Sequence, residues 1–407
     1  MTRHARAARH RIVVALALVA SPVACGSSGA ASIDYAATRS DASKENDQAP
    51  DASASIDEGI VEAPDDGASD VPLPDGSSPG RVILDHARIG SRNGTGWPNV
   101  GTASAAIDFD GPFEKATLIV DLDTTCFPFE KWTENPPPAG QNWPADCDAF
   151  DRNFNVFIDD RASSDAGGPP SFEVVHAITP FGGPEHIEVD VTDLANGLPG
   201  QHRITADINA YSDPTGQVTG SNNGWTVTVK LDAHRGTAPR HVLGAVSLFN
   251  GTQNPGDTAP VVSFMVPAAT TGGRIEYRTS GHGQGNPGIG CIGPAEEFCN
   301  HPHRILIDGA PYQETLRTWR TDCGRLCTIA HGTRFDSYCA ENPCGDPASV
   351  VASRANWCPG SMTPPFVWED IPALSTPGSH TIRFDITPIL SGGTWLVSAI
   401  YYAYGLI

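Results

Sequence analysis

The chain has 407 residues, a formal net charge of −21 and a sequence pI near 4.8, and it contains 42 glycines and 35 prolines. This length exceeds one small domain, and no long apolar stretch with a 3.6-residue period supports a helical bundle or a coiled coil. The acidic balance argues against nucleic acid as a partner, because neutralising phosphates requires clustered lysines and arginines. An all-β protein with many turns fits this composition.

The N-terminus has the layout of an export signal, because an arginine-rich start precedes the apolar run 12–20 and a small-residue stretch that ends at Cys25. The apolar run is too short to span a bilayer as a mature helix. Cys25 resembles the lipidated cysteine of a bacterial lipobox, although Pro22 stands where leucine is usual. We expect residues 1–25 to direct export and Cys25 to anchor the protein by lipid at the bacterial cell envelope, with simple secretion as the alternative.

Residues 26–80 consist mainly of Ala, Ser, Asp, Pro and Gly, with twelve acidic and two basic residues. Such a segment cannot bury enough apolar area to offset its chain entropy, so we expect a disordered acidic linker. The linker holds nearly half of the net charge. The acidity is therefore mainly a property of a solvated tether, and we assign it no chemistry.

From residue 81 onward, short β-branched and aromatic runs are separated by Gly, Pro, Asn and Asp. Several show the two-residue alternation of half-buried strands. Strands at this spacing are too many for one sandwich, so we predict an all-β fold of two consecutive jelly-roll-like antiparallel β-sandwiches, at residues 81–236 and 237–407. The runs that indicate strands are 116–122, 155–158, 186–191, 224–231 and 380–386.

Nine cysteines besides Cys25 indicate disulfides in an exported protein, and their odd number leaves at least one thiol unpaired within the chain. Zinc bound at 323–327 and 339–344 is the alternative, but export and the lack of a tight Cys-x2-Cys pair argue against it. The nine are Cys126, Cys147, Cys291, Cys299, Cys323, Cys327, Cys339, Cys344 and Cys358.

Three segments combine cysteines, charged residues and aromatics in ways that plain strands do not require. In the first, at 147–152, strand alternation directs Asp151 and Arg152 to opposite faces, so one of them needs a partner inside the protein or at an interface. The simpler alternative is an Asp–Arg surface pair.

In the second segment, Glu296 and Glu297 lie inside a Cys-x7-Cys loop. A crosslink would hold the two carboxylates close together, which separates their pKa values and provides an acid and a base at one pH. Two solvated glutamates in a closed hairpin are the alternative. In the third segment, Arg354 and Trp357 form either a platform on which a sugar stacks or a capped piece of core.

These segments together resemble the peptide-N-glycosidase F family of bacterial deglycosylating amidases. No single motif is specific, but the combination occurs in family order across most of residues 81–407. The resemblance rests on Cys147–Arg152, Ile178–Phe181, His186–Asp193, Arg278–Gly281, Glu297–Cys299 and Asn356–Gly360.

The resemblance implies a two-sandwich enzyme with its active site in the cleft between the domains. Such an enzyme hydrolyses the amide between an asparagine side chain and the first N-acetylglucosamine of an N-glycan, so it releases the glycan and leaves aspartate. The implied partners are N-glycosylated proteins or glycopeptides. The protein is expected to be a monomer, to need no metal or cofactor, and to touch a membrane only through its lipid anchor.

The resemblance also implies site residues. Asp151 and Glu297 match two essential carboxylates, and Asp207 aligns with a third, one methylene shorter than the family's glutamate. The other matches are substrate-binding residues and disulfides. They are Arg152, Arg354 and Trp357; Phe298 and His282, each in place of a tryptophan; and the pairs Cys126–Cys147, Cys291–Cys299 and Cys323–Cys358.

Amide hydrolysis by these residues is also reasonable on chemical grounds alone. An amide is a poor electrophile with a poor leaving group, so its hydrolysis needs a positioned water, a base and an acid. We expect Asp151 to be the primary acid/base group and Glu297 to orient water or the first sugar, while arginines stabilise charge on the carbonyl oxygen.

Two other functions remain as alternatives. The same pair of sandwiches resembles copper-dependent monooxygenases, and His301 and His303 form a His-x-His, although the mature chain offers only Met265 and Met362 as thioethers and no adjacent histidine pair. The second alternative is a lipid-anchored glycan-binding protein that keeps the fold without activity. Retention of Asp151, Glu297 and Arg354 speaks against it.

Overall fold

The structure, a computed structural model, describes residues 80–89, 101–159, 171–209, 224–283, 290–293 and 295–406. The expected export signal, the lipidation of Cys25 and the expected linker up to residue 79 lie outside these residues. All contacts described below fall within the compact unit of residues 72–407. In the ranges that are described, no helix has the length and apolar character needed to cross a membrane.

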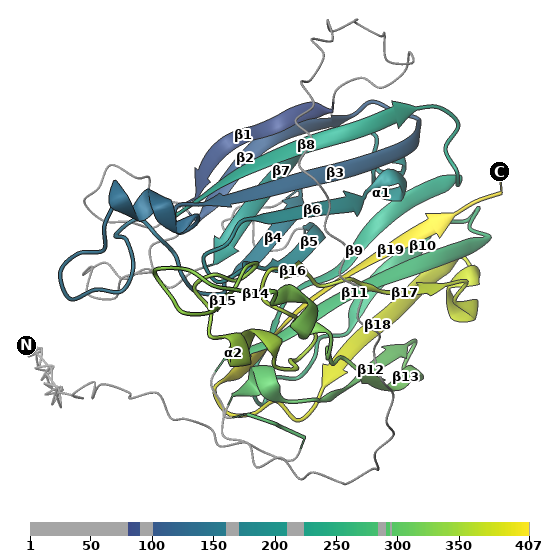
Figure 1. The fold of residues 1–407 in the computed structure, drawn as a ribbon. Helices are drawn as coiled ribbons and strands as arrows, with labels where there is room; N and C mark the ends of the chain where they lie inside the picture. Colours follow the sequence, from purple (N-terminus) through teal and green to yellow (C-terminus); the bar gives the residue numbers. More distant parts are fainter. Residues whose placement is uncertain are drawn as a thin grey trace, which may run out of the picture. The chain divides into compact units, whose positions relative to one another are not determined.

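The first sandwich packs a four-stranded sheet on a five-stranded sheet (Figure 1), and all strand pairs are antiparallel. The four-stranded sheet, in the order β1-β8-β3-β6, contains β1 (Arg81–Ile89), β3 (Phe113–Thr124), β6 (Glu185–Asp190) and β8 (Trp225–Arg235). The five-stranded sheet, in the order β16-β5-β4-β7-β2, contains β2 (Thr102–Phe109), β4 (Asn153–Ile158), β5 (Phe172–Ile178), β7 (Gly200–Asn209) and β16 (Ser361–Met362).

The second sandwich consists of two four-stranded antiparallel sheets. One, in the order β17-β11-β19-β9, contains β9 (Val242–Gln253), β11 (Gly272–Gly283), β17 (Phe366–Glu369) and β19 (Gly393–Tyr404). The other, in the order β10-β18-β12-β13, contains β10 (Val262–Val266), β12 (Pro302–Ile307), β13 (Ala310–Arg317) and β18 (Gly378–Ile386).

Alternating burial explains why these runs form sheets. In β3, Leu118, Val120 and Leu122 turn into the first core and are at most 1% exposed, while Asp121 and Asp123 lie on the other face. The two-sandwich, all-β prediction is confirmed. The runs that indicated strands are found in β3, β4, β6, β8 and β18.

The two sandwiches meet through the β5 sheet of the first and the β19 sheet of the second. The β19 residues Ile400, Tyr402 and Tyr404 pack in the core cluster of the first sandwich. Tyr404 donates a hydrogen bond of 2.8 Å to Asp193, in helix α1 (Thr192–Gly197). The strand β16 follows residue 237 in sequence but pairs with β5, so the division after residue 236 remains our proposal.

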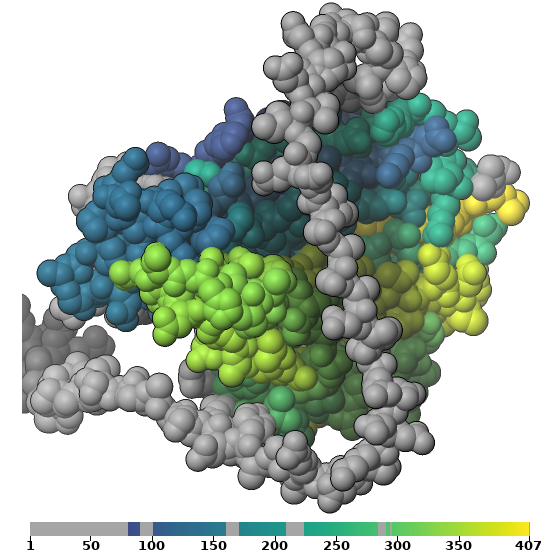
Figure 2. All heavy atoms as spheres, in the orientation of Figure 1, coloured from purple at the N-terminus to yellow at the C-terminus, as the bar shows by residue number. Residues whose placement is uncertain are grey.

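Short helices and a hairpin complete the described chain. The helices are α2 (Pro347–Val351) and the 3-10 helices η1 (Phe129–Thr133), η2 (Glu296–Phe298), η3 (Cys323–Leu326) and η4 (Pro372–Ser375), and the hairpin consists of β14 (Ile329–Ala330) and β15 (Tyr338–Cys339). The hairpin packs on the loop that contains η1, where the ring of Phe129 lies 5.4 Å from Phe335 and 5.2 Å from Tyr338. In Figure 2 the bright green hairpin region accordingly lies against the blue η1 loop.

The disulfides follow the pattern that the resemblance implies. The pairs Cys126–Cys147, Cys291–Cys299 and Cys323–Cys358 are present, and a fourth, Cys327–Cys339, closes the hairpin. These bonds occupy three of the four cysteines of the alternative zinc site. Among the described cysteines, Cys344 alone is unpaired; its sulfur lies within 4.8 Å of the Cys126 and Cys147 sulfurs. Burial raises the pKa of its thiol to about 12, so the thiol stays protonated at neutral pH.

Candidate active site

The start of β4 brings Asp151 to the junction of the two sandwiches. The Cys126–Cys147 disulfide anchors the segment before it. The buried carboxylate of Asp148 then accepts hydrogen bonds from the backbone of Phe150 and from Nε of Arg152, both at 3.1 Å. The backbone N–H of Arg152 also donates to the hydroxyl of Thr179, which follows β5, and the backbone N–H of Thr179 donates to the Arg152 carbonyl. The turn that presents Asp151 is therefore held from both sides, and Arg152 finds its expected partner in Asp148.

The second sandwich contributes Glu297, in η2, and Arg354, after α2. Nη1 of Arg354 lies 2.9 Å from Oε1 of Glu297, and the Arg354 side chain is only 1% exposed against 26% for Glu297. Nη2 of Arg354 donates to the backbone oxygen and hydroxyl of Ser349, at 2.9 and 3.0 Å. The backbone of Ala355 also donates to the Glu297 carbonyl at 2.7 Å. The arginine is thus a fixed buried cation beneath a partly open carboxylate.

Arg354 affects the ionisation of both Asp151 and Glu297. Burial raises the pKa of Asp151, and the charges of Arg354 and Arg152 oppose that rise. Burial also raises the pKa of Glu297; Arg354 lowers it again, while the negative charge of Asp151 raises it. Two carboxyl groups with raised pKa values beside one cation hold their protons more readily than exposed carboxyls do, which suits an acid/base pair.

Aromatic rings enclose the Arg354 guanidinium. It lies 4.8 Å from the ring centroid of Phe298 and 4.4 Å from that of Trp357. Trp357 is only 1% exposed, donates its indole N–H to the Gly281 carbonyl at 2.8 Å, and stacks on His282 at 5.4 Å. Of the two alternatives for Trp357, its burial fits the capped piece of core, and its contact with substrate stays a prediction, while His282, which stacks on it, is half-buried.

The expected pairing of Glu296 with Glu297 is wrong. Glu296 is fully buried and accepts hydrogen bonds from Trp395 at 2.7 Å and from the backbone of Leu390 at 3.0 Å. Glu297 turns the other way, toward Arg354. The two carboxylates diverge because β19 supplies a partner for Glu296 from about a hundred residues away in the sequence, which a short loop cannot reveal.

Asp207, the third predicted carboxylate, lies in β7 beside Asn155 of β4 and Thr102 of β2. Asn155 in turn lies opposite His176 of β5, so these residues form one row across the sheet. The row includes His176, which the sequence did not single out. His176 and Glu173, which lies three residues earlier in β5, are buried within an ordinary strand run, and no motif marks them.

The histidines proposed for copper do not fit a metal site. In His303, Nδ1 bonds the Tyr277 hydroxyl at 2.8 Å and Nε2 bonds the Thr318 hydroxyl at 3.2 Å, so neither nitrogen is open to a ligand. His301 lies beside Glu296, and the nearby Cys291 and Cys299 sulfurs are joined in a disulfide. Met265 is 62% exposed on β10. These contacts favour a structural role for the His-x-His.

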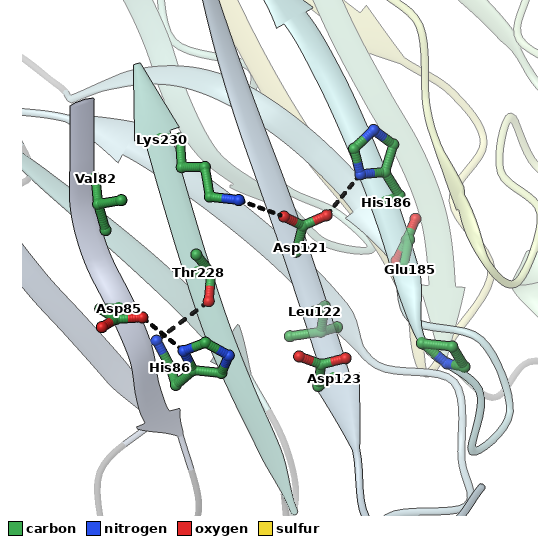
Figure 3. Close-up of a pocket in the computed structure, with 11 residues that line it drawn as sticks. Val82, Asp85, His86, Asp121, Leu122, Asp123, Glu185, His186, Thr228 and Lys230 are labelled. Carbon is green, nitrogen blue, oxygen red and sulfur yellow. Dashed lines mark hydrogen bonds and ion pairs between the residues drawn. The ribbon is translucent and has the colours of Figure 1, made fainter. Parts of the chain in front are cut away.

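A separate recess of about 410 Å³ lies on the outer sheet of the first sandwich (Figure 3). Three of its charged groups interact: Asp121 bonds His186 at 2.6 Å and lies 3.7 Å from Lys230. Glu185 also lines it; burial raises the pKa of this carboxyl to about 8. None of the predicted site residues lines this recess.

The comparisons with known proteins agree with the two-sandwich fold. A family model described as "Peptide-N-glycosidase F, C terminal" matches residues 252–401. The peptide-N(4)-(N-acetyl-beta-D-glucosaminyl)asparagine amidase F of Elizabethkingia miricola is 23% identical over 234 residues, which cover 54% of this chain and 57% of that protein. The chain thus spans little more than half the length of this curated relative.

Solved structures share the fold. A crystal structure of peptide-N(4)-(N-acetyl-beta-D-glucosaminyl)asparagine amidase has a TM-score of 0.57 at 16% identity, covering 80% of this chain and 96% of that one. The structure of PNGF-II has a TM-score of 0.56 at 19% identity, covering 79% of this chain and 65% of that one. PNGase F of Flavobacterium meningosepticum, described as a glycosylasparaginase, has a TM-score of 0.56 at 16% identity, covering 80% and 94%. The family match to residues 252–401, the curated relative and the shared two-sandwich fold together show that this chain is similar to the peptide-N-glycosidase F family.

Proposed function

We propose that the chain hydrolyses the amide bond between an asparagine side chain and the first N-acetylglucosamine of an N-linked glycan, and so releases the glycan and leaves aspartate. The observation that carries this proposal is the grouping of Asp151 and Glu297, from different sandwiches, around the buried guanidinium of Arg354. The names of the related amidases supply the bond type.

In the proposed reaction, Asp151 as carboxylate removes a proton from the attacking water and then returns it to the departing nitrogen. Its raised pKa suits both steps, because a group that titrates closer to neutral pH serves as base and as acid. Glu297, held by Arg354, orients the water or the first sugar. The positive charge of Arg354 and Arg152 favours the negative charge that develops on the carbonyl oxygen.

Several finer points are part of the proposal. Half-buried His282 and Phe298 form the wall that meets the first sugar, while Asp207 supports the site from β7. The substrates are N-glycosylated proteins or glycopeptides, and the protein acts as a monomer. The four disulfides are consistent with export, and we propose lipid anchoring through Cys25 at the cell envelope.

The proposal is tested by incubating the chain with a denatured N-glycoprotein and measuring free glycan. Asp151→Asn should lower kcat/KM by about 10³-fold or more, because it removes the acid/base group. Asp336→Asn, in the exposed hairpin loop, is the matched control and should behave as the parent does. Full activity in Asp151→Asn would remove this assignment. Binding of glycan without release by a folded parent protein would favour the inactive glycan-binding alternative.

A further inference from the structure

A chain of four buried or half-buried side chains crosses the junction between the sandwiches. Nδ1 of His176 lies 3.1 Å from Oε1 of Glu173, both in β5. Nε2 of His176 lies 2.6 Å from the hydroxyl of Ser280, in β11, and the same hydroxyl lies 2.6 Å from Nε2 of His282. Glu173, His176 and Ser280 are at most 3% exposed, so water does not compete for these bonds.

Glu173 is the charged end of this chain. Burial raises its pKa, but the charge of His176, the hydrogen bonds from His176 and Ser398, and the charge of Arg278 hold the pKa below its usual value. Asn155 also donates to Oε1 of Glu173 at 2.5 Å. An ionised carboxylate only accepts hydrogen bonds, so Nδ1 of His176 must carry a hydrogen.

The hydroxyl of Ser280 connects the two histidines. It has one hydrogen, so it donates to only one of the two Nε2 atoms, and the other must donate to it. If His176 is neutral, its Nε2 accepts from Ser280, and His282 must carry its hydrogen on Nε2. If His176 is protonated, Ser280 donates to His282, which then carries its hydrogen on Nδ1. Either way, the ring of His282 has one defined tautomer.

His282 connects this chain to the candidate site. Its ring stacks on Trp357, which in turn lies against the Arg354 guanidinium. Burial, together with the charges of His176 and Arg354, lowers the pKa of His282 to about 3, so the ring stays neutral and differs only in its tautomer. No group in the described part of the chain hydrogen-bonds Nδ1 of His282, which leaves this atom for a ligand.

We propose that Glu173, His176 and Ser280 are positioning residues that hold His282 in a single tautomer, so that Nδ1 of His282 has a fixed hydrogen-bonding role toward the first sugar of the substrate. This inference rests on the proposed function for its substrate. It gives a role to the buried polar side chains of Glu173, His176 and Ser280, which the proposed reaction does not otherwise use.

The direct test is the 15N spectrum of the full chain labelled at histidine nitrogens, which distinguishes the two tautomers and the cation. Signals are assigned with His176→Gln and His282→Gln. In the parent protein, His282 should show one tautomer: hydrogen on Nε2 if His176 is neutral, or on Nδ1 if His176 is a cation. A mixture, or either of the mismatched combinations, would overturn the proposal.

Ser280→Ala removes the connecting hydroxyl and should convert His282 to a mixture of tautomers. Ser247→Ala is the matched control, because Ser247 is a buried hydroxyl of β9 that donates at 2.9 Å to the Ser171 carbonyl and bonds no histidine. If Ser280→Ala does not fold, Ser280→Cys replaces the hydroxyl with a weak S–H donor of similar size. An unchanged His282 tautomer in the folded variant would contradict the proposed connection.

Kinetics separate this inference from the proposed function. Ser280→Ala should raise KM for a glycopeptide by about 5- to 10-fold, with little change in kcat, because a hydrogen bond to bound substrate is weakened in ground and transition states alike. If the parent protein releases no glycan, the proposed function fails, while the spectra still decide the tautomer. If the parent protein is active and Ser280→Ala keeps its KM, the positioning role fails alone.

Discussion

Carboxylates lie both at the junction of the sandwiches and in the recess on the outer sheet, but their burial and their charged partners differ. In the recess, the pair of Asp121 and His186 is open to water, because Asp121 is 35% exposed and His186 is 58% exposed. At the junction, Arg354 is 1% exposed, and burial raises the pKa values of Asp151 and Glu297. Carboxylates that are buried around a fixed cation therefore indicate a reactive site better than the number of carboxylates does.

After Asp151→Asn, the largest effect should come from removing the buried cation. Arg354→Met should lower kcat/KM by about 10²- to 10³-fold, because one charge that stabilises the carbonyl oxygen is lost. It should also lower the free energy of unfolding by about 3 kcal/mol, because Glu297 and Ser349 lose their buried partner. Glycan release and urea unfolding measure the two effects.

The control for this change is Arg325→Met. Arg325 is 61% exposed and pairs at the surface with Asp322. Its loss should change the free energy of unfolding by less than about 1 kcal/mol and leave glycan release unaffected. Equal effects of the two substitutions would show that burial of Arg354 has no special consequence.

Glu297→Gln should have the next largest effect on activity. It keeps the shape of the side chain but removes its charge, and we expect kcat/KM to fall by about 10²-fold. Because burial raises the pKa of Asp151, the acidic limb of the pH–rate profile of the parent should lie at higher pH than an exposed aspartate would give. A profile that falls only at the pH of an exposed carboxyl would contradict this account.

Glu185→Gln tests the effect of burying a carboxyl group that has no cation beside it. Burial alone raises the pKa of this carboxyl from 4.5 to about 8, and neither carboxyl oxygen has a hydrogen-bond partner among the described residues. The folded state keeps the proton that the unfolded state releases above pH 4.5, so stability is lost as the pH rises toward 8.

The glutamine variant is neutral at every pH and should escape this loss. Its free energy of unfolding relative to the parent should increase by up to about 1.4 kcal/mol per pH unit over that range, as measured by urea unfolding at several pH values. Parallel stability curves for variant and parent would show that Glu185 titrates as an exposed group does.

The smallest effect is expected at the exposed pair in the recess. Asp121→Asn should change the free energy of unfolding by less than about 1 kcal/mol, because solvent screens its pairs with His186 and Lys230. Glycan release should not change. A loss of activity here comparable to that of Glu297→Gln would place the function in the recess and contradict the comparison.

Much of the fold was predictable from local pattern. The alternation of apolar and polar residues in runs such as 116–122 predicts β3, because one face of the strand is buried and the other is exposed to solvent. The three disulfides and the grouping of Asp151 with Glu297 came from the resemblance to a family, since residues far apart in sequence carry no spacing rule.

What the sequence could not predict depends on distant partners. Glu296 is drawn away from Glu297 by Trp395, and Trp357 is buried beneath His282. The hydrogen-bonded series of Glu173, His176 and Ser280 is complete only when the two sandwiches pack together, so no local sequence motif predicts it.

The central claim is that the chain cleaves the amide of a glycosylated asparagine at the junction of its sandwiches. It is tested most directly by incubating the full chain with an N-glycopeptide in water enriched in oxygen-18 and analysing the peptide by mass spectrometry. The account predicts that asparagine becomes aspartate with one heavy oxygen in its carboxyl group, and that Asp151→Asn abolishes this conversion. A peptide that keeps its asparagine, bare or still carrying a sugar, would contradict it.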